Sequence, residues 1–422
     1  MAQGPILIFD KSTLQALNPD EAHWLDNFFM SNITPLFYIE TLADLEKEVR
    51  KGKSPEQVVG EIAYKSPDMQ AHPNAHHLTL IWGELVGKGE IKMVGFPILG
   101  GGQPVILEGA TGVIYKQSPE AEAFNRWQHG EFLEVERGMA KQWRRELASV
   151  DLQAIAASFK NIHENAGRPH QLADIKVLAD TIVDGPDQES VLRLGLELTI
   201  GYDDWGEQVM TRWNSLGRPR VRDYAPYLTH VLTVDLFFYL AMAAGQIGSQ
   251  RRSNKADIAY LYYLPFCMVF TSRDNLQVRS APFFLRPDQS FVHGDDLKAD
   301  LKKLDFYYDA LPEEEKKKGV YSFAACPPDD DLYLVTRLWK KHMTPPSVSQ
   351  QHPSKYEGKT VYVPPAGSDP KEIIKALDDF EANAVPLPPR HPLPWTRQRS
   401  FNSRGSSGGK RESGSGYPRR YR

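Results

Sequence analysis

Four aspartates stand where predicted strands meet predicted helices. Asp10 comes directly after the apolar run 5–9, and Asp274 follows a second short apolar run. Asp44 follows a predicted strand and opens a helix, and Asp257 starts another helix. The carboxyl ends of parallel strands share one edge of an α/β sheet, and such folds bind their ligands there. We therefore expect the four carboxylates to meet at that edge.

Carboxylates gathered in this way suit divalent metal chemistry. Their oxygens are hard ligands of the kind that Mg²⁺ and Mn²⁺ prefer. Several of them in a partly desolvated cleft repel one another until a cation binds. The cation then orients a water, lowers its pKa and neutralises the charge that builds on a phosphate. Glu40 lies near the second aspartate, Asp44, and is a candidate to replace it. The four aspartates are the expected catalytic residues. The expected ligands of Mg²⁺ or Mn²⁺ are Asp10, Glu40, Asp44, Asp257 and Asp274.

Each of these residues also has a simpler interpretation. An aspartate at the end of a strand commonly caps the next helix or stabilises a turn. Ser12 fits a helix cap as well as it fits a place in the site. Lys11 and Arg273 adjoin two of the acids and are candidates to contact a phosphate, although solvated charges are the commoner case. The order of the four acids and their shared context favour the metal site.

The acidic segments resemble those of the PIN-domain family of ribonucleases. In that family the first acid follows the opening strand and precedes a Ser or Thr by two residues, as Asp10 precedes Ser12. The second lies in a segment like Thr-Leu-Ala-Glu-Leu, matched by residues 41–45 with Asp in place of Glu. The third begins a helix, which Asp257 matches loosely, and the fourth ends a strand, as in residues 270–274.

The resemblance covers residues 1–49 and 255–285. It implies a PIN-like fold and hydrolysis that leaves a 5′-phosphate and a 3′-hydroxyl. The expected function is therefore a metal-dependent endoribonuclease acting on single-stranded RNA, with single-stranded DNA as an alternative substrate. Two other functions stay open. One is a catalytically inactive PIN-like scaffold that binds RNA or protein, and the other is a small-molecule hydrolase that uses the same acidic edge.

The spacing of apolar residues predicts an α/β fold, with a parallel sheet flanked by helices. The strands are expected at 5–9, 33–39 and 266–271, with 277–285 as a further candidate. The helices near them are expected at 14–28 (broken at Asn18-Pro19-Asp20), 41–50, 255–263, 295–308 and 312–318. Residues 67–112 look irregular or partly β, and further helices are expected at 118–147, 150–166, 172–183, 188–200 and 224–244.

Together with the resemblance, these elements predict one PIN-like domain over residues 1–342. Its core segments are about 1–50 and 255–285, and a mainly helical insertion occupies about 65–250. Residues 343–422 are rich in Pro, Gly and Ser, with one candidate helix at 369–384, and are expected to be a largely disordered tail. From residue 396 onwards the tail has eight Lys or Arg and one Glu, a composition that binds RNA loosely or serves as an inert linker.

Other sequence features narrow the class of protein. The two cysteines, Cys267 and Cys326, exclude a disulfide framework and a Cys-based zinc site. The apolar run 231–245 is too short to span a membrane and contains Asp235, so we expect a buried core helix. Asp235 is expected to pair with Arg220, Arg222 or His230, or to supply an extra metal ligand.

The expected location is the cytoplasm. RNA is the expected partner, and no association with a membrane is expected. The sequence leaves open a protein inhibitor and a second copy of the chain. The basic helix at 124–147 carries Trp127 and Trp143 and is a second candidate RNA-binding surface; a solvated face above a buried tryptophan stripe is the alternative.

Overall fold

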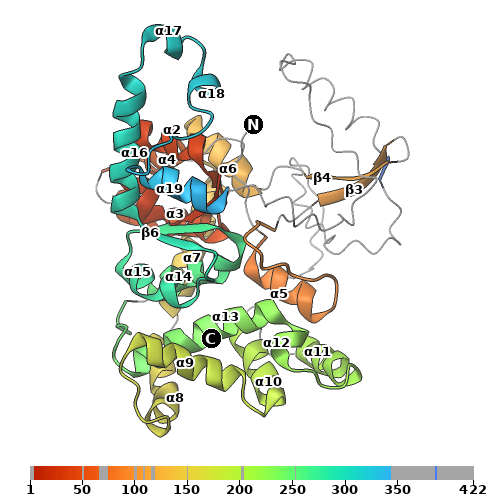
Figure 1. Cartoon of the computed structure of the whole chain (residues 1–422). Helices are drawn as coiled ribbons and strands as arrows, with labels where there is room; N and C mark the ends of the chain where they lie inside the picture. The colour runs from red at the N-terminus through yellow and green to blue at the C-terminus, as the bar shows by residue number, and fades with distance from the viewer. Residues whose placement is uncertain are drawn as a thin grey trace, which may run out of the picture.

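A four-stranded parallel sheet flanked by helices organises the chain (Figure 1). The computed structural model describes residues 4–49, 52–65, 75–98, 102–107, 110–115, 119–149, 151–200, 204–251, 253–343 and 385–386. The sheet has the order β2-β1-β5-β6, and every neighbouring pair is parallel. Its strands are β1 (Ile6–Phe9), β2 (Met30–Ser31), β5 (Val269–Ser272) and β6 (Ser290–His293). The predicted α/β class with a parallel sheet is confirmed.

The central strand β1 is apolar because both of its faces are covered. Ile6 and Ile8 pack into one hydrophobic core, whereas Leu7 and Phe9 pack into a second core on the opposite face. Successive side chains of a strand point to opposite faces, so an uninterrupted apolar run is required here.

The connections place a topological switch point between β1 and β5. From β1 the chain runs to β2 on one side, and after residues 32–268 it returns as β5 on the other side of β1. Loops that leave the carboxyl ends of two such strands go to opposite sides of the sheet and leave a crevice between them. The segments after Phe9 and Ser272 therefore border the position where α/β proteins bind ligands.

Among the first helices, the predicted break is present, but a helix replaces the predicted second strand. They are α1 (Lys11–Ala16), α2 (Pro19–Phe28), α3 (Pro35–Val49) and α4 (Pro55–Ala63). Asn18 caps α2 and forms a capping box with Glu21, which confirms the break at Asn18-Pro19-Asp20. The strand expected at 33–39 is wrong, because Pro35 begins a helix of 15 residues there. Proline is favoured in the first helical turn, and a short apolar run does not distinguish a strand from a buried helix.

Helices dominate the long connection between β2 and β5. It includes α3 and α4 and continues, before α14 (Asn254–Ala259), with α5 (His77–Leu85), α6 (Pro119–Gln128), α7 (Glu134–Ser149), α8 (Leu152–Asn165), α9 (Leu172–Val183), α10 (Gln188–Thr199), α11 (Asp204–Ser215), α12 (Val221–Tyr224) and α13 (Pro226–Ala243). The hairpin of β3 (Gly102–Leu107) and β4 (Ala110–Tyr115) also lies here, and β7 (Val385–Pro386) pairs with β3. Helices α5 and α11 were not predicted, and the helix expected at 118–147 is two helices.

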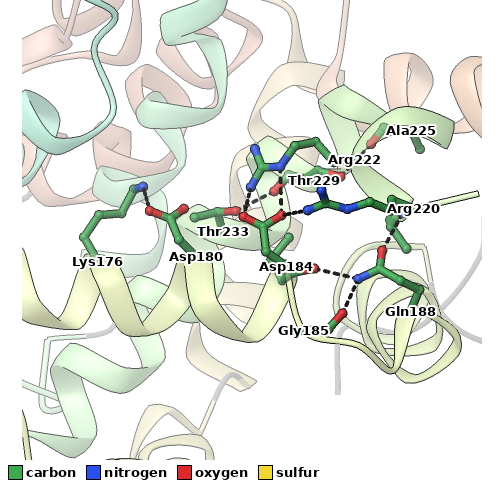
Figure 2. Close-up of polar contacts among 12 residues, drawn as sticks. Lys176, Asp180, Asp184, Gly185, Gln188, Arg220, Arg222, Ala225, Thr229 and Thr233 are labelled. Carbon is green, nitrogen blue, oxygen red and sulfur yellow. Dashed lines mark hydrogen bonds and ion pairs between the residues drawn. The ribbon is translucent and has the colours of Figure 1, made fainter.

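Helices α8, α9, α10 and α12 pack against α13. Together with α11 they form a layer at the bottom of the view, away from α2 and α16 (Figure 1). Within the described residues α13 alone is long and apolar enough to cross a membrane, but 83% of its window is buried inside the protein. The predicted core helix is therefore confirmed. Asp184, which caps the end of α9, accepts hydrogen bonds from Arg220 and Arg222 and thereby joins α9 to α12 (Figure 2).

In the second half of the sheet region, the sequence predicted one strand that does not form and missed one that does. Its helices are α14 (Asn254–Ala259), η1 (Tyr260–Phe266), α15 (Asn275–Ser280), η2 (Ala281–Phe283), α16 (Gly294–Asp309), α17 (Glu313–Lys316), α18 (Val320–Phe323) and α19 (Leu334–His342). The strand expected at 277–285 is wrong, because α15 and η2 occupy that segment; the fourth strand is β6 instead. The predicted tail at 343–422, with its helix at 369–384, lies outside the described residues except for Met343 and β7.

Candidate active site

Asp10 lies at the carboxyl end of β1, where it caps α1. Its Oδ1 accepts hydrogen bonds from the Thr13 amide (2.9 Å) and hydroxyl (2.7 Å). Its Oδ2 accepts from the hydroxyls of Ser12 (2.6 Å) and Ser272 (3.0 Å). Burial raises the pKa of Asp10 above its usual value, and these hydrogen bonds offset part of that effect. The carboxylate is therefore held in a fixed orientation by three hydroxyl groups.

Asp274 occupies the matching place after β5. It caps α15, because its Oδ1 accepts a hydrogen bond from the Leu276 amide (2.8 Å). The Asp274 amide donates to the Ser272 hydroxyl (2.9 Å), the same hydroxyl that donates to Asp10. Ser272 therefore connects the two acids across the switch point. The helix-cap interpretation is confirmed for both aspartates, and capping uses only one oxygen of Asp274.

Asp257 lies on α14 and is 8% exposed. Its Oδ2 accepts no hydrogen bond from any part of the chain that the structure describes. Burial raises the pKa of Asp257 to about 8, and the charges of Asp274 and Glu40 add to the increase. Arg251 lowers that pKa, and the charge of Asp10 raises it further. Acids from four different elements thus act on one another at the edge of the sheet.

Glu40 reaches the same neighbourhood from α3. Its Oε2 accepts a hydrogen bond from the buried Tyr260 hydroxyl (2.7 Å), which links α3 to η1. Asp44 lies one helical turn further along α3, and its side chain lies outside the described residues. The second acidic segment therefore comes from a helix, not from the end of a strand as predicted. The structure places Asp10, Glu40 and Asp274 close enough to Asp257 for their charges to act on it.

Arg251 lies beside two of these acids. Its Nη2 is 3.5 Å from Asp257 Oδ2 and 3.9 Å from Asp274 Oδ2. Its Nε donates a hydrogen bond to the Ser253 hydroxyl (2.8 Å), and the side chain is 65% exposed. Nothing in the sequence pattern marked this residue, because it lies in a short polar segment before α14 and far along the chain from the first acids.

The donor chemistry of this cluster fits Mg²⁺ or Mn²⁺. Carboxylate oxygens and hydroxyls are hard ligands, and the Asp257 oxygen without a hydrogen bond is a buried acceptor that a cation would satisfy. Among the described side chains, no three of His, Cys, Asp or Glu already form a set that could hold a metal ion. The acids therefore share one electrostatic environment without forming a finished coordination shell.

The two basic residues that adjoin acids in the sequence differ in accessibility. Lys11 is 3% exposed, and its Nζ donates to the Glu40 backbone oxygen (3.4 Å). Arg273 is partly exposed and forms an ion pair with Asp295 (2.6 Å). Lys11 therefore helps to hold α3 against the site, whereas Arg273 is oriented toward α16.

Asp235 has a different partner from those predicted. Its Oδ1 is 2.5 Å from Lys255 Nζ and also accepts a hydrogen bond from the Tyr262 hydroxyl. Arg220 and Arg222 instead pair with Asp184 (Figure 2). His230 was also wrongly expected to be the partner; its Nε2 interacts with the Leu261 backbone oxygen.

The second candidate RNA-binding surface, the predicted basic helix at 124–147, does not expose Trp127. Trp127 is fully buried, and its indole N–H donates to Glu136 (3.0 Å), which also binds Arg126 (2.6 Å). A buried indole offers no face to a base, so the interpretation as a buried tryptophan is confirmed for Trp127. The side chain of Trp143 lies outside the described residues.

Comparison of the chain with protein families, with curated proteins and with solved structures found no match. The proposed function therefore depends on the chemistry of the acidic site.

Proposed function

We propose that the protein is a metal-dependent nuclease with a PIN-like domain, which hydrolyses phosphodiester bonds of single-stranded RNA. The main support is the meeting of four acids from four elements at the switch point of a parallel sheet. Acids whose pKa is raised by burial and by one another are typical of functional sites. The resemblance of the acidic segments to PIN-domain ribonucleases supplies the reaction and the substrate class.

Asp10, Glu40, Asp257 and Asp274 would hold Mg²⁺ or Mn²⁺, together with Asp44. The bound cation would supply charge neutralisation at the phosphate and a more acidic water. The residues of the chain fix this arrangement. Ser12, Thr13 and Ser272 hold the Asp10 carboxylate, and the Tyr260 hydroxyl orients Glu40.

Cleavage of labelled single-stranded RNA with Mn²⁺ or Mg²⁺ tests the proposal. We expect cleavage that requires the metal and falls by about 100-fold in Asp10→Asn and Asp257→Asn, because each change removes negative charge from the site. Asp180→Asn is the matched control, since Asp180 pairs with Lys176 on α9 in the helical layer and should keep full activity (Figure 2). Cleavage that persists in EDTA or in both site variants would refute the assignment.

One observation favours an inactive scaffold as the second candidate. Asp10 already accepts four hydrogen bonds, so a folding role explains its place without any metal. A scaffold would bind RNA equally with and without metal and would show no cleavage. Asp257→Asn separates the two functions, because the proposed nuclease needs this carboxylate to hold the metal, whereas a scaffold should bind RNA equally well with or without it.

A further inference from the structure

Arg251 occupies a position between two of the proposed metal ligands. Its Nη2 lies 3.5 Å from Asp257 and 3.9 Å from Asp274, and both contacts are to the Oδ2 atoms. Neither distance is that of a fitted, charge-assisted hydrogen bond, which is about 2.7–2.9 Å. The guanidinium therefore balances the two charges without being fixed to either carboxylate.

The remaining contacts of Arg251 allow it to leave this position. Its Nε donates to Ser253 on its own segment, and 65% of the side chain is exposed to solvent. The two acids are far less exposed, at 11% and 18% of their side chains. The carboxylates thus stay in place with the sheet edge, whereas the arginine can swing into solvent at little cost in packing.

We propose that Arg251 is a removable counter-cation of the acidic site. In the metal-free protein it balances Asp257 and Asp274; it gives way when a divalent cation binds and then contacts a phosphate of the RNA. This inference rests on the proposed metal-dependent function. It adds a regulated step to that function, because metal binding and release of the arginine become one exchange.

Electrostatics and geometry explain why an exchange is required. A guanidinium and a divalent ion at the same two carboxylates would lie within a few Å of each other and repel strongly. Once displaced, the arginine remains beside the site on the flexible end of an exposed side chain. Its planar fork of donors matches the oxygens of a phosphate, which a lysine does not match in the same bidentate way.

Calorimetric titration with MnCl₂ tests the first half of the proposal. We expect Arg251→Gln to bind Mn²⁺ about two- to fivefold more tightly than the unmodified protein, the size of effect that an exposed ion pair gives. Arg220→Gln is the matched control, because Arg220 is similarly exposed and its carboxylate partner Asp184 caps the C-terminal end of α9, in the helical layer (Figure 2). This control should bind Mn²⁺ as the unmodified protein does.

Binding of a hydrolysis-resistant phosphorothioate RNA in the presence of Mn²⁺ tests the second half. We expect Arg251→Gln to weaken this binding about fivefold and to reduce its salt dependence by about one phosphate contact. Arg251→Lys should retain the salt dependence, because it keeps the charge, and should recover only part of the affinity.

The outcomes separate this inference from the function on which it rests. If the unmodified protein binds no Mn²⁺, the metal-dependent function itself is wrong. If it binds Mn²⁺ with the same affinity as Arg251→Gln, the metal site stands and the counter-cation role is refuted. If the variant binds Mn²⁺ more tightly but binds RNA normally, the phosphate contact is refuted.

Discussion

Asp257 is a buried carboxylate in a place that does not favour its charge. It is 8% exposed, one of its oxygens accepts no hydrogen bond within the described part of the chain, and other acids surround it. A residue of this kind destabilises the fold and is retained where it has a chemical role. At the scale of single residues, burial of this carboxylate therefore lowers stability, and a chemical role at the proposed metal site would explain it.

Replacing this carboxylate should stabilise the metal-free protein. Burial raises the folded-state pKa of Asp257 to about 8. At pH 8 the carboxyl group ionises far more easily in the unfolded chain than in the folded protein, and this difference lowers the stability of the fold. We expect Asp257→Asn to increase the free energy of unfolding by about 1–3 kcal/mol at pH 8 in EDTA. Urea unfolding monitored by circular dichroism measures the change; a variant less stable than the unmodified protein would contradict this account.

The residues of the site were only partly predictable. Asp10 and Asp274 follow strands, and a strand end fixes its residue at the edge of a parallel sheet, so their meeting could be inferred from the sequence. Ser272 and Tyr260 became visible only in the structure, because their roles depend on contacts between residues more than 200 positions apart. Arg251 depends on a loop conformation that no periodic pattern encodes.

At the scale of elements, a buried ion pair holds α14 against α13. Lys255 on α14 reaches Asp235 on α13 at 2.5 Å, and the Tyr262 hydroxyl donates to the same carboxylate. Burial disfavours the charged lysine, but Asp235, Tyr239 and Tyr262 together outweigh this effect, so the pKa of Lys255 lies well above its usual value. Asp257 is two residues further along α14, so this pair also positions the acidic site.

Removing one member of the pair should be costly. We expect Lys255→Met to lower the free energy of unfolding by about 3–5 kcal/mol, because Asp235 would be left charged and buried. In the control Lys176→Met, the loss should be below about 1 kcal/mol, since its partner Asp180 is 39% exposed and surface pairs contribute little (Figure 2). Chemical denaturation of both variants measures these losses of unfolding free energy. Equal losses would mean that burial of the carboxylate partner does not matter.

The element errors have a common physical origin. Residues 33–39 and 277–285 are rich in β-branched and aromatic residues, yet both segments are helical. Each contains a proline, Pro35 or Pro282, in the first turn of its helix, and tertiary packing overrides weak strand propensity. The opposite error concerns β6. Only its two middle residues, Phe291 and Val292, are apolar, and this pattern is too short to identify a strand.

At the scale of the whole molecule, buried acids shape how stability depends on pH. Glu84 on α5 is 5% exposed and accepts hydrogen bonds from the Tyr227 and Leu228 amides at the start of α13. Burial raises the pKa of Glu84 to about 7, and these hydrogen bonds offset part of the increase. A folded-state pKa above the unfolded value means that stability is full below about pH 4.5 and is lost as the pH rises through 7.

The free energy of unfolding should therefore decline between pH 5 and pH 8. Glu84→Gln should remove part of this decline. Between pH 5 and pH 8 the variant should lose about 1–3 kcal/mol less of its free energy of unfolding than the unmodified protein loses. Urea titrations at several pH values measure both curves. Parallel curves for the two proteins would show that Glu84 ionises in the fold without penalty.

The position of β5 in the sheet has a consequence for synthesis. β1 leaves the ribosome first, but its neighbour β5 follows only after residues 32–268. At about 5–20 residues per second, translation of this connection takes on the order of 10–50 seconds. During that time the segment carrying Asp10 has no partner strand on the β5 side, and Asp257 and Asp274 are not yet made. The acidic site therefore cannot assemble before synthesis has passed Asp274.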